Sequence, residues 1–108
     1  MLINLTNDAW FGQTPGPWQH LAQAHMRAVE EGIPMVRVAN TGISAVFDGV
    51  GSTRGEIGLG ETGFLDVKVP LSLPRTVYAR WREAGFLVLL GMFVAVITWL
   101  DRARSIRQ

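Results

Sequence analysis

A long apolar segment near the C-terminus constrains this fold more than any other feature of the sequence. Residues 85–100 read GFLVLLGMFVAVITWL and include no charged side chain. A helix of this length spans about 24 Å, and extension back to Trp81 brings it to the thickness of a bilayer core, about 30 Å. Trp81 and Trp99 then stand near the two ends, where aromatic side chains gather at membrane interfaces. We therefore predict a transmembrane helix over residues 81–102.

The alternative is that this helix is the buried core of a soluble domain. A chain of 108 residues has too little other material to surround a helix that is apolar on every face, so this alternative is disfavoured. The positive-inside rule does not orient the helix, because the flanking arginines are balanced. These are Arg75, Arg80 and Arg82 before it and Arg102, Arg104 and Arg107 after it. The N-terminus lacks the pattern of a signal peptide, so residues 1–80 would need an upstream segment to leave the cytoplasm.

The composition narrows the class of the remaining residues. With 48% hydrophobic and 18% charged residues, the chain is too apolar to be disordered, and its length suits one domain. Its net charge of +1 gives no support to a nucleic-acid partner. The absence of cysteine excludes disulfides, cysteine-bound zinc and a thiol nucleophile supplied by these residues.

The order of the local patterns predicts an α/β fold. Residues 2–6 are typical of a buried strand, and a strand that begins at residue 2 suggests a piece of a larger fold. Apolar residues recur on one face of 18–31, which predicts a helix. The other predicted segments are strands at 35–39, 43–47, 56–58 and 64–69, a glycine-rich reversal at 48–55 and an extended connector at 71–79. One helix covers one face of such a sheet, so the other face and an edge stay uncovered, and residues 1–80 alone should be marginally stable.

Most polar patterns in the chain match no known chemistry. His20 and His25 are five residues apart rather than the four of a helical metal pair, so we predict packing or capping roles and no metal site. The glycines of 49–60 match no phosphate-binding motif. Ser44 and Ser52 lack the setting of a serine nucleophile, and the only lysine, Lys68, is expected to be solvated.

The segment NDAWFG, residues 7–12, is different because it puts Trp10 and Phe11 on a loop at the C-terminal end of a strand. In α/β sheets, ligands bind at this end of the strands. The residues alone leave two interpretations open. The loop is either a ligand-binding element or an aromatic lid over the domain's own core.

Four motifs together carry a family resemblance. NDAWFG at 7–12, GPWQH at 16–20, RAVE at 27–30 and NTGIS at 40–44 resemble the C-terminal part of bacterial apolipoprotein N-acyltransferases, which belong to the nitrilase, or carbon-nitrogen hydrolase, superfamily. The resemblance covers essentially the whole chain, including the final apolar helix and its arginine-rich tail. It implies the C-terminal half of a nitrilase-like α-β-β-α sandwich over residues 1–70, a connector over 71–80, the transmembrane helix over 81–102 and a basic tail over 103–108.

The resemblance also implies an activity. Enzymes of this family transfer an acyl chain from a phospholipid to the N-terminal cysteine of a diacylated lipoprotein, through a thioester on their own cysteine and without a cofactor. The family's catalytic Glu, Lys and Cys precede the NDAWFG motif, so the chain holds no catalytic residue and should be inactive alone. The expected site residues are Trp10 and Phe11 for substrate binding and Asn7, His20 and Asn40 for support of the pocket. The family's topology implies the bacterial inner membrane, with residues 1–80 periplasmic and the C-terminal tail cytoplasmic.

A membrane-tethered interaction module is the alternative hypothesis. In this case the open edge of the sheet adds a strand to a partner's sheet. The module hypothesis predicts that residues 1–80 form a stable monomer without the helix, whereas the fragment hypothesis predicts that they aggregate. A soluble half of a carbon-nitrogen hydrolase is disfavoured by the terminal apolar helix.

Overall fold

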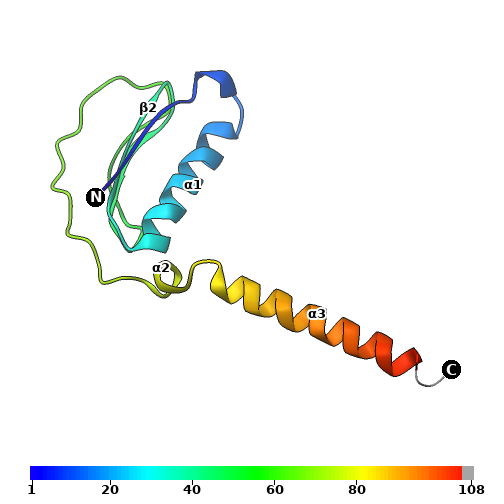
Figure 1. Ribbon diagram of the computed structural model, residues 1–108. Coiled ribbons are helices and arrows are strands. Elements are labelled where there is room, and N and C mark those ends of the chain that lie inside the picture. Colours follow the sequence, from blue (N-terminus) through cyan, green and yellow to red (C-terminus); the bar gives the residue numbers. More distant parts are fainter. Residues whose placement is uncertain (106–108) are drawn as a thin grey trace.

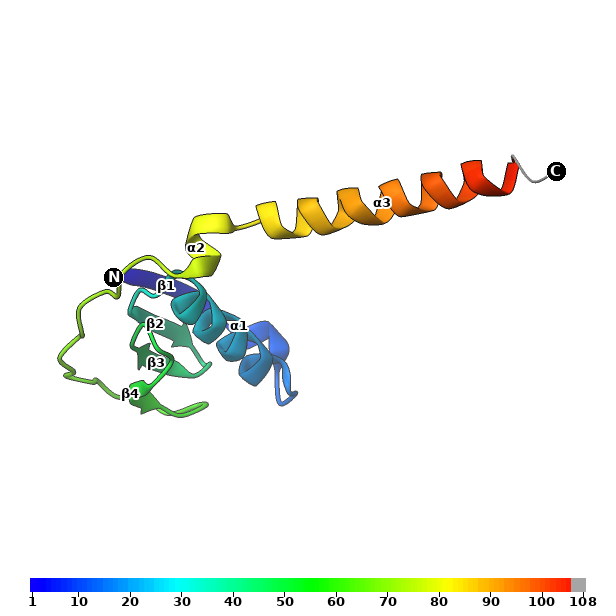
Figure 2. The ribbon, with the colours of Figure 1, turned by 90° about the horizontal axis from the view of Figure 1, so that it is seen from below.

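A computed structural model describes residues 1–105. A small α/β domain formed by the N-terminal residues is followed by a helix that projects away from it (Figure 1). A single helix, α1, covers one face of the sheet (Figure 2). The elements in chain order are β1 (Leu2–Asn7), the 3-10 helix η1 (Ala9–Phe11), α1 (Gly16–Glu31), β2 (Met35–Asn40), β3 (Ser44–Phe47), β4 (Thr53–Ile57), α2 (Val77–Trp81) and α3 (Ala84–Ser105).

The four strands form one sheet in the order of the sequence. β1 and β2 are parallel because α1 connects them, whereas β2 with β3 and β3 with β4 are antiparallel. The parallel register pairs Asn7 with Asn40 at the carboxyl ends of β1 and β2. The loops that follow these two strands, 8–15 and 41–43, therefore lie at the same edge of the sheet.

α1 ends at the predicted residue, Glu31, and begins two residues before the predicted start. Pro17 lies in the first turn, where its missing amide proton costs nothing, and Gly32 ends the helix in a left-handed conformation with φ of 66°. The buried side chains of Ala24 and Ala28 are small, so the helix packs closely on the sheet. The core cluster consists of these two alanines with Met35, Ala45 and Phe47, and with Leu2 and Leu21 packed against it.

The predicted strand at 64–69 is wrong. These residues belong to an irregular segment, 58–76, that runs outside the sheet (Figure 1). A Cβ on Gly55 of β4 would come within 2.7 Å of Leu65 and 2.9 Å of Val67. Because a Cβ points out of the plane of a sheet, these two residues pack on the face of β4 and not beside its edge. Side-chain packing thus replaces the backbone pairing that the alternating pattern predicted.

The turn between β3 and β4 is tighter than predicted, so β4 begins before residue 56. The Asp48 carboxylate accepts hydrogen bonds from the amides of Val50 at 3.1 Å and Ser52 at 2.7 Å. Burial alone would raise the pKa of Asp48, but the Ser52 amide, the Arg54 guanidinium and the Val50 amide together lower it below its usual value. The carboxylate therefore closes a turn that the glycine pattern had extended to residue 55.

The outer face of β1 and β2 is uncovered, as predicted. Ile3 is 64% exposed, Leu5 is 74% exposed and Val38 is 51% exposed. We call these three residues the outer patch. Within residues 1–105, β1 also has no strand on its outer side.

α2 replaces the end of the predicted extended connector, 71–79, and attaches to α1. The Thr76 hydroxyl accepts a hydrogen bond from the first turn of α2 at 3.0 Å and donates to the Glu30 carbonyl of α1. Across the same contact, the Tyr78 hydroxyl, and then the Glu30 carboxylate, raise the pKa of Arg27. These contacts attach α2, and with it the segment that leads to α3, to the α/β domain.

The predicted span over 81–102 divides into two helices. Trp81 ends α2, and Arg82 has a φ of 41°, a value that breaks a helical path, so α3 starts afterwards. The apolar part of α3, Ala84–Arg102, has the length and composition to cross a membrane, and none of it is buried in the structure. The predicted basic tail, 103–108, begins within α3, and its remainder lies outside the described residues.

Candidate functional site

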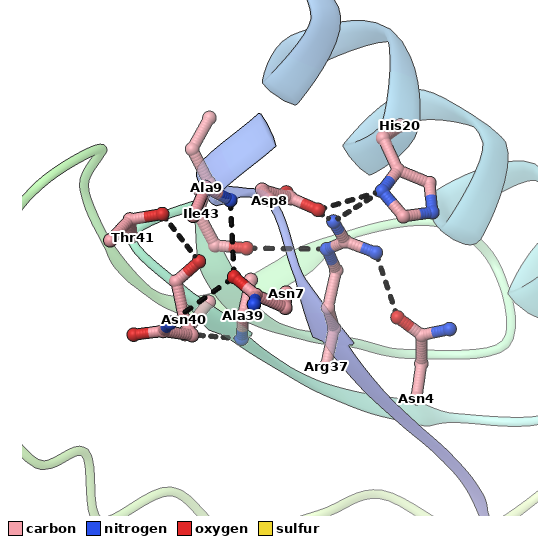
Figure 3. Close-up of polar contacts among 11 residues, drawn as sticks. Asn4, Asn7, Asp8, Ala9, His20, Arg37, Ala39, Asn40, Thr41 and Ile43 are labelled. Carbon is pink, nitrogen blue, oxygen red and sulfur yellow. Dashed lines mark hydrogen bonds and ion pairs between the residues drawn. The ribbon is translucent and has the colours of Figure 1, made fainter. Parts of the chain in front are cut away.

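Two asparagines join the carboxyl ends of β1 and β2. The side-chain oxygen of Asn7 accepts hydrogen bonds from the amide of Ala9 and from the side chain of Asn40, both at 3.1 Å (Figure 3). The amide of Asp8 donates to the Asn40 carbonyl at 3.0 Å. Asn7 and Asn40, both predicted to support a pocket, thus lie together at the start of η1.

The Asp8 carboxylate is buried below η1 and accepts hydrogen bonds from two elements. Its Oδ2 accepts from Nη2 of Arg37 on β2, and its Oδ1 accepts from Nδ1 of His20 on α1, each at 2.8 Å (Figure 3). The side chains of Asp8 and Arg37 are fully buried, and that of His20 is 32% exposed. Because an ionised carboxylate can only accept hydrogen bonds, we assign His20 the tautomer that carries a proton on Nδ1. His20, another predicted supporting residue, is therefore hydrogen-bonded to Asp8, the first residue of the loop 8–15.

Arg37 completes this network and was not predicted as a site residue. Its Nη1 donates to the side-chain oxygen of Asn4 at 2.7 Å, and its Nε donates to the Ile43 carbonyl at 3.2 Å. A buried charge is costly unless it is paired and hydrogen-bonded, and these partners meet that need. One signal was present in the sequence. Arg37 occupies an inward position of a strand whose alternate side chains face the core.

The two aromatic residues of the loop have different surroundings. The centroid of the Phe11 ring lies 5.8 Å from that of the His20 ring. The Phe11 ring also covers Gly16, where an added Cβ would come within 2.3 Å of Cδ1 of Phe11. Gly12 then turns the chain at φ of 56°. Trp10, by contrast, is 81% exposed. Of the two interpretations left open by the sequence, an aromatic lid over the domain fits Phe11 but does not fit Trp10.

A groove of about 760 Å³ lies beside the loop. Its walls come from the loop, the first turn of α1 and the turn that follows β4. The lining residues are Asp8, Ala9, Gly12, Gln13, Thr14, Pro15, Pro17, Trp18, Thr41, Leu59 and Gly60. Trp18, in the first turn of α1, is 51% exposed here. An open, mainly apolar groove of this kind suits an extended apolar chain.

Among residues 1–105 the arrangement provides shape and fixed charge. Asp8 and His20 form a carboxylate–imidazole pair like those that activate a nucleophile. Within residues 1–105, however, no hydroxyl is hydrogen-bonded to His20, and the sequence contains no cysteine. The same residues contain no cluster of three or more His, Asp or Glu side chains that could hold a metal ion. The site therefore has the shape and the fixed polar groups to orient a ligand.

Comparison with known proteins identifies the family of this chain. A sequence model of the carbon-nitrogen hydrolase family matches residues 1–79. Among the relatives are proteins named apolipoprotein N-acyltransferase from Sinorhizobium medicae (58% identical over 108 residues), Bradyrhizobium diazoefficiens (55% over 97) and Rhodopseudomonas palustris (50% over 96). These matches cover 100%, 88% and 89% of this chain but only 20%, 18% and 18% of the relatives, so the chain spans about a fifth of their length. The resemblance predicted from NDAWFG and GPWQH is confirmed, and the chain belongs to the carbon-nitrogen hydrolase family.

Proposed function

We propose that this chain is part of an apolipoprotein N-acyltransferase, which moves an acyl chain from a phospholipid to the N-terminal cysteine of a diacylated lipoprotein. The observation that carries the proposal is the 58% identity, over the whole chain, to a protein of that name. The geometry supports it. A groove and an exposed tryptophan lie on the loop side of the sheet, and a following helix is apolar enough to stay in the membrane with such substrates.

In this proposal Trp10 contacts the acyl chain or the lipoprotein. Phe11, packed against the start of α1, supports the loop that carries Trp10. An indole ring that is exposed in its own domain gains about 25 cal/mol for each Å² that it buries against hydrocarbon. Asn7, His20 and Asn40 keep the loop in place. All five residues act by orienting the substrate, which is a large part of catalysis when reacting atoms must meet in one geometry.

The chemical steps need a thiolate that these residues do not contain. In the first step the thiolate attacks the ester carbonyl of the phospholipid, a thioester forms and the lysophospholipid leaves as the alcohol. In the second step the lipoprotein amine attacks the thioester, an amide forms and the thiol is released. We place this cysteine, with its Glu and Lys partners, upstream of Leu2. The chain by itself should therefore give no acylated product from phospholipid and lipoprotein acceptor.

The proposed location is the bacterial inner membrane, with α3 as a span, residues 1–80 in the periplasm and the C-terminal tail in the cytoplasm. The apolar length of α3 supports a span, since 19 residues reach about 28 Å. Protease added to spheroplasts should digest residues 1–80 and spare the tail. Digestion of the tail alone would contradict this orientation.

A chimera tests the activity in the setting of a whole enzyme. The matching residues of the Sinorhizobium medicae protein are replaced by this chain, and acylation of a diacylated lipoprotein is followed by mass spectrometry in cells depleted of their own enzyme. We expect acylation to be retained and Trp10→Ala to reduce it at an unchanged protein level. Val50→Ala, at an exposed apolar residue away from the loop, is the control. A chimera that accumulates normally but transfers no acyl chain would contradict the proposal.

A membrane-tethered interaction module is the second candidate, because the outer patch and the free edge of β1 offer a surface for another strand or sheet. The two candidates differ in what residues 1–80 do alone. A monomer that unfolds cooperatively would favour the module. Aggregation that is reversed by the rest of the enzyme would favour the acyltransferase fragment.

A further inference from the structure

The Arg37 guanidinium lies inside the domain and connects both parallel strands to the loop 8–15. Its donors reach acceptors on β1, on the turn after β2 and on Asp8, the first residue of the loop. We propose that Arg37 is a positioning residue, which holds Asp8 and, through it, the loop that presents Trp10 and forms one wall of the groove. Its catalytic consequence rests on the proposed acyl transfer, while the positioning itself is measurable without it.

Burial makes the Asp8–Arg37 ion pair hard to separate. The side chains of Asp8 and Arg37 are both 0% exposed, so water cannot take the place of either partner when the pair separates. Separation would leave two unpaired charges in a medium of low dielectric constant. His20 holds the second carboxylate oxygen of Asp8 at 2.8 Å, which prevents the group from rotating. Two directed hydrogen bonds therefore fix the Asp8 carboxylate at the start of the loop.

Gly42, in the neighbouring loop, shows how little space surrounds the ion pair. A Cβ at this position would lie 2.3 Å from Oδ2 of Asp8, the same oxygen that accepts from Arg37. Any larger residue at position 42 therefore forces the Asp8 side chain or the turn 41–43 to move. Gly42→Ala therefore disturbs the contact between Asp8 and the turn 41–43 without changing any charge.

The network is separate from the hydrophobic core of the domain. The core cluster is Ala24, Ala28, Met35, Ala45 and Phe47, and none of these residues belongs to the network. Trp10 is 81% exposed and takes little orientation from packing. Its direction must come from the hydrogen bonds and packing of the loop itself, which include the Asp8 contacts, the Asn7 bond to the Ala9 amide and the contact of Phe11 with Gly16.

Three variants of the chimera test the proposal against a matched control. Asp8→Asn combined with Arg37→Met removes both charges, so no unpaired charge stays buried. Gly42→Ala disturbs the contact between Asp8 and the turn 41–43 by steric contact alone. Arg37→Lys keeps the charge but loses the planar fork that reaches several acceptors. The control, Arg54→Met, breaks another Arg–Asp pair, with Asp48 at 2.7 Å, in the β3–β4 hairpin.

Amide hydrogen exchange reports the position of the loop directly. In the double variant and in Gly42→Ala we expect the hydrogen-bonded amides of Ala9 and Phe11 to exchange about tenfold faster, while those of β2 and of α1 after its first turn stay protected. Acyl transfer should lose roughly 10- to 100-fold in kcat with a smaller change in KM, as expected when an orienting group is misplaced. Arg37→Lys should give intermediate values, and Arg54→Met should change neither loop exchange nor kcat.

Unchanged exchange of the Ala9 and Phe11 amides in both the double variant and Gly42→Ala would overturn the proposal. Equal acceleration in the loop and in β2 would also overturn it, because Arg37 would then act only on overall stability. If the unsubstituted chimera transfers no acyl chain, the proposed function fails. Loop exchange in that same protein still decides whether Arg37 positions the loop.

Discussion

His25 donates a hydrogen bond from Nε2 to the carbonyl oxygen of Gly51 at 2.7 Å, and its ring centroid lies 4.7 Å from that of Phe47. The bond links the middle of α1 to the turn between β3 and β4. Gly51 has a φ of 90°, and a Cβ there would come within 2.9 Å of the imidazole, so this close approach requires glycine. His25 thus has the packing role predicted from the sequence, and the hairpin is held on the helix.

We expect His25→Ala to destabilise the domain by about 2 kcal/mol, because it removes one hydrogen bond and one aromatic contact. His25→Gln keeps a donor and should lose less. Thermal unfolding of the chimera measures both, with Gln23→Ala at an exposed position of the same helix as the control. A midpoint for His25→Ala equal to that of the control would show that the contact adds nothing to stability.

Gly16→Ala should impair acyl transfer more than it impairs stability. Its Cβ would meet Cδ1 of Phe11 at 2.3 Å, so the ring must leave the start of α1 and carry the Trp10 loop with it. Alanine favours the helix, which offsets part of the steric cost. We expect roughly a tenfold lower kcat for the chimera. Gly63→Ala is the control, because a Cβ at that position would lie 4.0 Å from the nearest atom. Equal activity of the two variants would contradict the proposal that Phe11 supports the Trp10 loop.

Local patterns in the sequence were sufficient to predict α1, β1, β2 and β3. The helix is indicated by its end signals and by apolar residues that recur every 3.6 positions, and the strands by short apolar runs. Each of these signals involves residues that are close together in the sequence. The prediction of a strand at 64–69 failed for a physical reason. Alternating apolar residues are equally compatible with a paired strand and with an irregular segment that packs its side chains on the face of β4, as Leu65 and Val67 do on Gly55.

The candidate site was predictable only in part. Asn7, His20 and Asn40 were found through a family resemblance, and the structure brings Asn7 together with Asn40 and His20 together with Asp8. The pairing of Asp8 with Arg37 spans 29 positions, and no local pattern in one sequence indicates which acid a buried arginine will meet. The break at Arg82 was missed because its positive φ is unusual for a residue with a side chain.

Acid should weaken the β3–β4 hairpin through Asp48. Its pKa is lowered in the folded state, so its contribution to stability is fully present above the unfolded pKa of about 3.9 and is lost as the pH falls through the folded value. Asp48→Asn should therefore lower the unfolding midpoint at pH 7 and reduce the loss of stability below about pH 4. Unfolding midpoints between pH 7 and pH 2 measure this, with exposed Asp66→Asn as the control. A pH profile of Asp48→Asn parallel to that of the unsubstituted chimera would contradict the assignment.

The outer patch should be covered in the whole protein. Leu5 is 74% exposed and pairs in register with Val38 in the parallel sheet, so the two form a continuous apolar surface. If another layer packs on this face, Leu5→Lys buries an unpaired charge and should reduce both the level and the unfolding midpoint of the chimera. Val50→Lys, also at an exposed apolar residue but in a turn, should have little effect. A normal level and midpoint for Leu5→Lys would mean that the face meets solvent, which favours a tethered module over a piece of a larger sandwich.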